Sequence, residues 1–264
     1  MKILVTFALE NEFAPWRAMH SFRPGKWGAA DAYFAQIGTA EVGVVLTGVG
    51  PRAAKRELLK VLATEHDEIN CIVSSGLAGA LRTELELGQV LTARYVYSEN
   101  PRPELNTQVL QSSAALVSFA ADCGATVVNR FLSANHVVAT AAEKRLMGAN
   151  ADAVEMESFD VLHQAAEFGV PAMALRAISD LATEDLPLDM GEILTDAGQV
   201  SLPRVLERVA RHPQSLPSLM RLGQNSKRAA ESLAGILDSF VRTVATKSRA
   251  LETSASMTAS SQGQ

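Results

Sequence analysis

Short apolar runs separated by segments with helical spacing constrain the fold of this chain most strongly. Residues 2–8, 71–75 and 171–179 are nearly continuous apolar runs, as expected of strands that are covered on both faces. Pro51 opens a segment whose apolar residues recur at helical spacing, and proline suits the first turn of a helix. Buried strands that alternate with helices predict an α/β protein, a three-layer α/β/α sandwich with a mixed central sheet.

The remaining pattern extends this prediction along the chain. Further strands are expected at residues 33–37, 41–47, 89–97 and 126–132, and further helices at residues 108–121, 141–148, 153–168, 202–210 and 216–244. The sequence SGLAGAL at residues 75–81 is expected to be a loop. We expect a single domain over residues 1–245. Residues 246–264 are mostly small and polar, so they are expected to form a disordered C-terminal tail.

Charge, cysteine content and the N-terminal sequence limit which partners and which compartment are expected. The 264 residues include 24 Lys and Arg against 29 Asp and Glu, a formal charge of −5, which argues against nucleic-acid binding. Two cysteines, Cys71 and Cys123, suggest free thiols in a reducing compartment. The N-terminal apolar run of about seven residues is too short for a signal peptide or a membrane span. We therefore expect a cytoplasmic protein with no membrane partner.

Acidic and glycine-rich segments follow several of the expected strands. They are Glu10 and Glu12, the sequence TGVG at 47–50, the sequence SGLAG at 75–79, and Ser179 with Asp180. Ligands bind at the carboxyl ends of strands in open α/β sheets. A further segment, VEMES at 154–158, carries two carboxylates. No zinc-type spacing or Ser-His-Asp arrangement accompanies them, so neither a metal nor an organic cofactor is expected.

The order of these segments resembles a known family. TGVG, SGLAGAL, VEMES and RAISD, with a glutamate after the first strand, are similar to the nucleoside phosphorylase and nucleosidase superfamily of the purine and uridine phosphorylase type. The resemblance covers residues 1–182. Its nearest branches are the methylthioadenosine/S-adenosylhomocysteine nucleosidases and the hopanoid-associated phosphorylase-like proteins. It implies a nucleoside as substrate, water or phosphate as co-substrate, and a homodimer or higher homo-oligomer.

The resemblance also implies roles for individual residues. Asp180 corresponds to the acid that acts on the purine, and Glu12 to the glutamate that positions the attacking water. Met156 would pack under the ribose, and Glu157 would hydrogen-bond it. Further expected substrate contacts are Val137, Ala78, Gly79 and Ser179.

Two departures from the family pattern bear on the co-substrate. Leu77 stands where the family commonly has Ser or Thr, and Phe7 stands where its phosphorylases usually have glycine. Both changes remove groups that would hold phosphate, so hydrolysis of a purine-type nucleoside is the favoured function. One alternative is a phosphorylase in which Arg52 and Gly50 bind the anion. The other alternative is a nucleoside-binding protein of the same fold without turnover.

Simpler interpretations exist for the same residues. Asp180 could simply be a helix cap. Glu12 could simply be a first-turn residue that the helix dipole favours. Glu155 and Glu157 lie two residues apart and do not share a helix face. We expect Glu157 to point into the site and Glu155 to point toward solvent or a partner. Arg176, in an apolar strand, is expected to pair with a carboxylate.

Overall fold

The structure, a computed structural model, describes residues 1–99, 109–187 and 216–261, with side chains described to residue 247. The strands are β1 (Lys2–Phe7), β2 (Arg23–Trp27), β3 (Ala30–Ile37), β4 (Ala40–Leu46), β5 (Cys71–Ala80), β6 (Val90–Ser98), β7 (Val109–Gln111), β8 (Thr126–Ser133), β9 (Ala153–Glu155) and β10 (Ala172–Asp180). The helices are α1 (Glu10–Met19), α2 (Pro51–Glu65), the 3-10 helix η1 (His66–Glu68), α3 (Ala114–Asp122), α4 (Ala141–Met147), α5 (Ser158–Glu167) and α8 (Leu216–Ser261).

The strands form one mixed ten-stranded sheet in the order β10-β6-β8-β9-β5-β1-β4-β3-β2, with β7 paired to β6. Strand β10 pairs with β5 as well as with β6. Strands β5, β10, β6, β8 and β9 therefore close into a ring, while β1 to β4 continue as an open sheet. This closure brings the ends of β5, β9 and β10 together.

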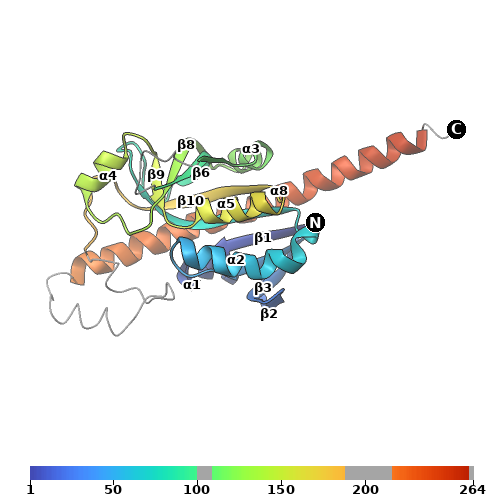
Figure 1. Ribbon diagram of the computed structural model, residues 1–264, viewed down its shortest axis with the longest axis horizontal. Helices are drawn as coiled ribbons and strands as arrows, with labels where there is room; N and C mark the ends of the chain where they lie inside the picture. The colour runs from blue at the N-terminus through green and yellow to red at the C-terminus, as the bar shows by residue number, and fades with distance from the viewer. Residues whose placement is uncertain (100–108, 188–215, 262–264) are drawn as a thin grey trace.

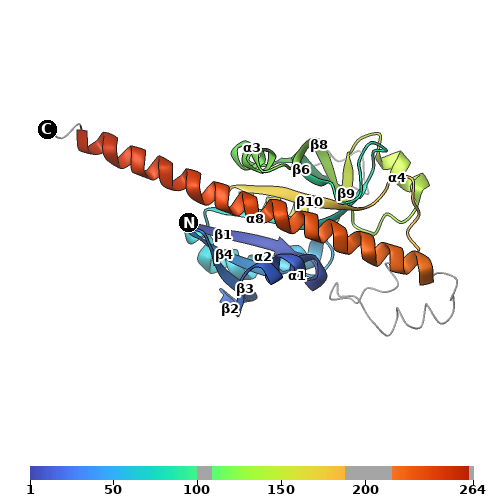
Figure 2. The ribbon, with the colours of Figure 1, turned by 180° about the vertical axis from the view of Figure 1, so that it is seen from behind.

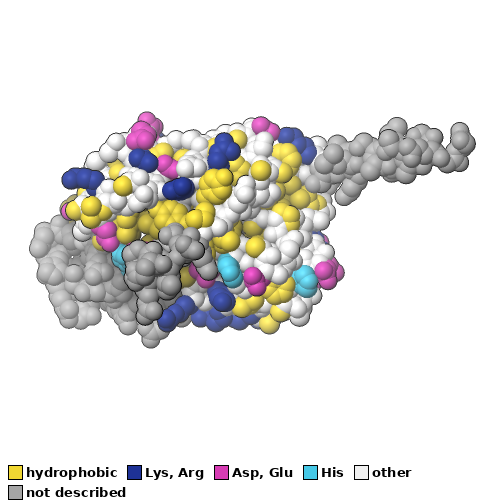
Figure 3. All heavy atoms as spheres, turned by 45° about the horizontal axis from the view of Figure 1, so that its top comes forward, with side chains coloured by type: hydrophobic (Ala, Val, Ile, Leu, Met, Phe, Trp, Pro, Cys, Tyr) yellow, Lys and Arg dark blue, Asp and Glu magenta, His cyan; other side chains and the backbone are white. Residues whose placement is uncertain are grey.

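Helices cover both faces of the sheet (Figures 1 and 2). One apolar core unites residues of α1, α3 and α8 with the sheet. A second core unites residues of α2 and α5 with the opposite face. The predicted α/β class, with helices in layers around a mixed central sheet, is confirmed. Acidic and basic side chains are interspersed with apolar ones on the face shown in Figure 3.

Local differences from the expected elements have physical causes. The segment expected to be a loop continues β5 to Ala80, because Gly76 and its neighbours pair with β10. Residues 109–111 pair with β6 instead of starting a helix, and α3 begins at Ala114. Strand β2 is not predicted by the sequence pattern, because four of its five residues are exposed and two are proline and glycine. The helix expected at 202–210 lies outside the described residues.

Helix α8 packs along the body of the protein and then extends beyond it (Figure 2). It continues to Ser261, into the segment whose composition predicts disorder. Lys247, near the start of that segment, contacts Asp122 at 2.9 Å and lies 4.5 Å from the Phe119 ring centre. A single domain over 1–245 and a disordered tail stay predictions. None of the described helices combines the length and apolar content that a membrane crossing requires.

Candidate active site

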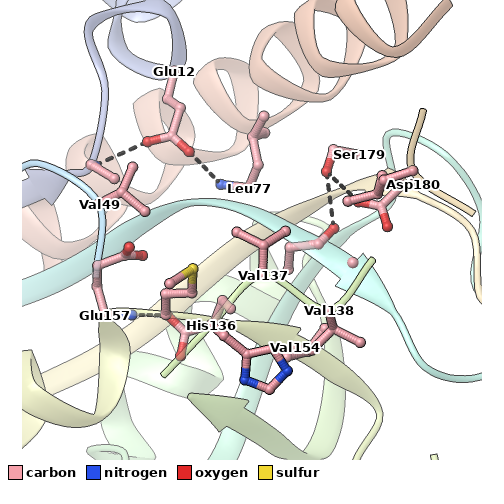
Figure 4. Close-up of a pocket in the computed structure, with 16 residues that line it drawn as sticks. Glu12, Val49, Leu77, His136, Val137, Val138, Val154, Glu157, Ser179 and Asp180 are labelled. Carbon is pink, nitrogen blue, oxygen red and sulfur yellow. Dashed lines mark hydrogen bonds between the residues drawn. The ribbon is translucent and has the colours of Figure 1, made fainter. Parts of the chain in front are cut away.

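A pocket of about 160 Å³ lies where β5, β9 and β10 end (Figure 4). Its wall contains both predicted catalytic residues and all six predicted substrate contacts: Asp180, Glu12, Met156, Glu157, Val137, Gly79, Ala78 and Ser179. The two predicted anion ligands differ. Arg52 is exposed in the first turn of α2, and it does not line this pocket. Gly50 donates a backbone hydrogen bond to Glu157.

Arg176 organises one end of the pocket. Its guanidinium is buried and contacts two carboxylates, Glu155 at 2.6 Å and Glu157 at 3.3 Å. It also donates hydrogen bonds to the Ser74 and Ser158 hydroxyls. Burial lowers the pKa of Arg176, but Glu155, Glu157 and Glu12 outweigh burial, so its pKa is raised. The expectation that Arg176 pairs with a carboxylate is confirmed.

Glu12 is held by backbone groups. One carboxyl oxygen accepts hydrogen bonds from the amides of Ala8 and Leu9, at 3.0 and 3.1 Å, and the other accepts from Leu77 at 3.1 Å. Burial raises the pKa of Glu12 above its usual value, while Arg176 and these amides oppose that shift. A buried carboxylate of raised pKa is a better proton acceptor near neutrality.

Gly76 allows Arg176 and Glu12 to approach each other. Its φ is +147°, and a Cβ there would lie 2.6 Å from Arg176 Nη1 and 3.2 Å from both carboxyl oxygens of Glu12. A side chain at this position would displace the guanidinium. The glycine is therefore required by both backbone conformation and space.

Glu157 stands at the start of α5, opposite the end of β4. Its carboxylate accepts a 2.8 Å hydrogen bond from the amide of Gly50, whose φ is +94°. Burial raises the pKa of Glu157 to about 7; Glu155 and Glu12 add to that shift, and Arg176 opposes it. Met156 also lies near Gly50, 3.8 Å from where a Cβ would stand.

The position of Glu155 differs from the expectation that it points toward solvent or a partner. It does not point toward solvent, because its side chain is 1% exposed. Its carboxylate accepts hydrogen bonds from the amides of Glu157 and Ser158 and from the Ser133 hydroxyl. These bonds fix the start of α5, and Glu155 and Glu157 both line the pocket.

Asp180 lies at the other end of the pocket (Figure 4). Its Oδ2 accepts a 2.9 Å hydrogen bond from the Ser179 hydroxyl, and its Oδ1 pairs with the ammonium of Lys144. A Cβ on Gly79 would lie 2.9 Å from Oδ1, so the glycine makes room for the carboxyl group. Lys144 could not be predicted from the sequence, since a single lysine on a short helix usually faces solvent.

The middle of the pocket is apolar. Leu77, Val137, Val138 and Val154 line it. Phe7 does not: it packs in the core, 5.6 Å from the Phe13 ring centre. Successive residues of a strand point to opposite faces, which is why the neighbouring Ala8, not Phe7, lines the pocket. Phe7 therefore makes no direct contact with the pocket, and of the two departures from the family pattern only Leu77 lines it.

His136 also lines the pocket. Its Nε2 lies 2.7 Å from a carboxyl oxygen of Glu143, and its Nδ1 lies 3.4 Å from one of Glu99. The hydrogen bond with Glu143 raises its pKa. The described His, Cys, Asp and Glu side chains form no group of three or more that could hold a metal ion. Cys71 and Cys123 are free thiols, as expected.

A family model described as the phosphorylase superfamily matches residues 2–242. The chain belongs to the phosphorylase superfamily. Solved structures with the same fold include two methylthioadenosine/S-adenosylhomocysteine nucleosidases. A mutant of the Helicobacter pylori nucleosidase, with 5′-methylthioadenosine in the active site, has a TM-score of 0.69 and 19% identity over 91% of this chain and 97% of its own. The Neisseria meningitidis nucleosidase, with methylthio-immucillin-A, has a TM-score of 0.70 and 19% identity over 92% and 99%.

An enzyme with a different activity has the same fold. Native futalosine hydrolase of Helicobacter pylori has a TM-score of 0.70 and 19% identity, covering 91% of this chain and 97% of its own. At this identity the likeness establishes the fold. The reaction and substrate of this superfamily member therefore have to be argued from its own residues.

The crowding of carboxylates around Arg176 predicts how stability depends on pH. A glutamate has an ordinary pKa of 4.5, and the folded protein raises that of Glu157 to about 7. Between these values the folded state binds more protons than the unfolded state, so stability falls as pH rises through this window. Replacing Glu157 with glutamine removes this contribution. We expect the melting temperature to fall less from pH 5 to pH 8 in the Glu157→Gln variant than in the parent.

Thermal unfolding at several pH values measures this difference. The exposed Glu167, at the end of α5, provides the control, because Glu167→Gln should follow the parent curve. A steeper pH dependence in Glu157→Gln than in the parent would contradict the assignment.

Proposed function

We propose that this chain hydrolyses the N-glycosidic bond of a purine-type nucleoside. The proposal is supported above all by one arrangement: Asp180 and the pair Glu12 and Glu157 line opposite ends of one pocket with an apolar middle. A purine ring suits the apolar walls. The base becomes a better leaving group when a donor protonates one of its ring nitrogens. A ribose needs acceptors for its hydroxyls, and a carboxylate provides strong ones.

The reaction begins with proton transfer to the base. The carboxyl group of Asp180 gives its proton to a ring nitrogen as the bond from C1′ to the base breaks, and the bonding electrons stay with the base. General acid help of this kind contributes about 10²–10⁴ in rate. Glu157 accepts hydrogen bonds from the ribose hydroxyls, with Met156 beneath the sugar. The positive charge that develops on the sugar lies close to these buried acids.

Water completes the reaction at C1′. Glu12 orients the water and accepts its proton as the new C–O bond forms, so the products are free base and free sugar. The Leu77 amide, already bonded to Glu12, keeps the carboxylate in place. Release of the accepted proton to solvent and uptake of one by Asp180 restore the starting state.

Electrostatics favours water over phosphate as the co-substrate. Glu12, Glu155 and Glu157 surround the guanidinium of Arg176, so three acidic groups share one cation at this end. A phosphate there would be repelled, and burying it without donors is costly. Leu77 offers no hydroxyl, and Arg52 is exposed outside the pocket.

Product analysis with and without phosphate tests this proposal. The purified chain is incubated with methylthioadenosine, S-adenosylhomocysteine, adenosine and inosine in phosphate-free buffer and in millimolar phosphate. We expect free base and free sugar at the same rate in both buffers. Sugar 1-phosphate, or strict dependence on phosphate, would establish a phosphorylase instead. Tight nucleoside binding with no base release from any of the four would establish a binding protein.

A further inference from the structure

Lys144 has an unusual position for a lysine. Its side chain is 0% exposed, although lysines are rarely buried unless paired. The ammonium contacts a carboxyl oxygen of Asp180 and donates to the carbonyl oxygens of Leu181, at 2.9 Å, and Glu184, at 3.0 Å. An ammonium has three donors and no acceptor, so these three oxygens use all of its hydrogen-bonding capacity.

The surrounding backbone fixes this position. The hydroxyl of Thr140 caps α4 by accepting a hydrogen bond from the Glu143 amide at 3.2 Å. Gly148, directly after α4, packs closely on the end of β5, since a Cβ there would lie 2.4 Å from the carbonyl oxygen of Leu81. Helix α4 is thus held against the strand that lines the pocket, and Lys144 projects from it toward Asp180.

We infer that Lys144 is a positioning residue for the acid Asp180, which it orients and whose carboxylate it stabilises after proton transfer. The inference rests on the proposed function. Asp180 is held from two sides, by Lys144 at Oδ1 and by Ser179 at Oδ2. Its side chain remains 12% exposed and lines the pocket, so part of the carboxyl group stays open to a ligand.

The chemistry of the proposed reaction explains what a buried cation does here. When Asp180 gives its proton to the base, a negative charge appears on its carboxyl group. A fixed ammonium beside that charge stabilises it where water is excluded, without the reorganisation that solvent would require. Lys144 acts through its charge and takes no part in the proton transfer itself.

Stability alone does not account for this ammonium. Removing an ammonium from water is costly, and a well-packed apolar side chain of similar size usually serves the fold as well as a buried ion pair does. The charge of Lys144 is directed at the one pocket carboxylate that lies away from Arg176. A charge that is costly to bury and that faces the proposed acid is best explained by the reaction.

A double-mutant cycle tests the inference. Lys144→Met keeps the length of the side chain and removes its charge. We expect it to lower kcat for base release by about 10²-fold, the size typical for loss of one preorganised electrostatic contact, with little change in KM. In an Asp180→Asn background the same substitution should cause no further loss, because the group that it serves is gone. Arg145→Met, an exposed change on the same helix, should behave as the parent.

The possible outcomes separate the inference from the proposed function. Unchanged kcat in Lys144→Met, or an equal loss in both backgrounds, would overturn the role of Lys144 while leaving nucleoside hydrolysis intact. No base release by the parent chain would overturn the proposed function, and this inference with it. If Lys144→Met does not fold, as judged by circular dichroism, Lys144→Gln is measured instead, since it keeps a hydrogen-bond donor without the charge.

Discussion

Replacement of Asp180 by asparagine is expected to slow base release by about 10²-fold or more. The amide has the size of the carboxyl group and can still accept a hydrogen bond from Ser179, but it has no proton to transfer. The loss should appear in kcat and in kcat/KM alike, because the missing interaction operates in the transition state. Steady-state kinetics with the best nucleoside from the product analysis measures both.

A fold defect has to be separated from this effect, since the ammonium of Lys144 loses its charged partner in the variant. Thermal unfolding and circular dichroism show whether Asp180→Asn remains folded. Asp185→Asn is a suitable control. Asp185 is exposed and accepts a 2.7 Å hydrogen bond from the Ala141 amide, which asparagine can also accept. Turnover close to the parent rate in Asp180→Asn would remove Asp180 from the mechanism.

Replacement of Arg176 by methionine should have the largest effect on stability. It leaves the carboxylates of Glu155 and Glu157 buried without their cation, and removing one partner of a buried pair costs about 3–5 kcal/mol. Protonation of the abandoned carboxylates relieves the cost. The difference between variant and parent should therefore be smaller at pH 5 than at pH 8.

Urea unfolding at the two pH values measures this difference. Arg17→Met supplies the contrast: Arg17 pairs with Glu10 at 2.6 Å, but both side chains are 45% exposed, and exposed pairs contribute little. Arg176→Lys keeps the charge but cannot reproduce the planar fork of donors, so it should fall between parent and methionine variant. Equal stability of Arg176→Met and the parent at pH 8 would show that the carboxylates do not depend on this cation.

Elements with a strong periodic or apolar signal could be predicted from the sequence. The runs at 2–8, 71–75 and 171–179 became the buried strands β1, β5 and β10, because such runs are stable only between two layers. Acids placed after these strands were brought to one pocket, as the geometry of α/β sheets requires. The pocket wall therefore holds Glu12, which follows β1, and Asp180, which ends β10.

Features that depend on long-range packing could not be predicted in this way. The glycines of residues 75–81 favour a loop locally, yet pairing with β10 makes them part of β5. Lys144 and Glu155 resemble solvated residues when only their neighbours in sequence are considered, because the partners that bury them come from other elements. Phe7 faces the core because strand alternation points it away from the pocket, which a family position alone does not indicate.

The direct pairing of β5 with β10 holds Arg176 and Asp180 on a fixed backbone, whereas other residues of the pocket lie on loops outside that pairing. Arg176 is paired with Gly76, and Asp180 with Gly79, so the backbone ladder sets the spacing between the two ends of the pocket. Val137 and Leu186 line the same pocket from segments outside helices and strands. Changes at these two positions alter the shape that a ligand meets without shifting the ladder. Redesign of substrate preference should begin there.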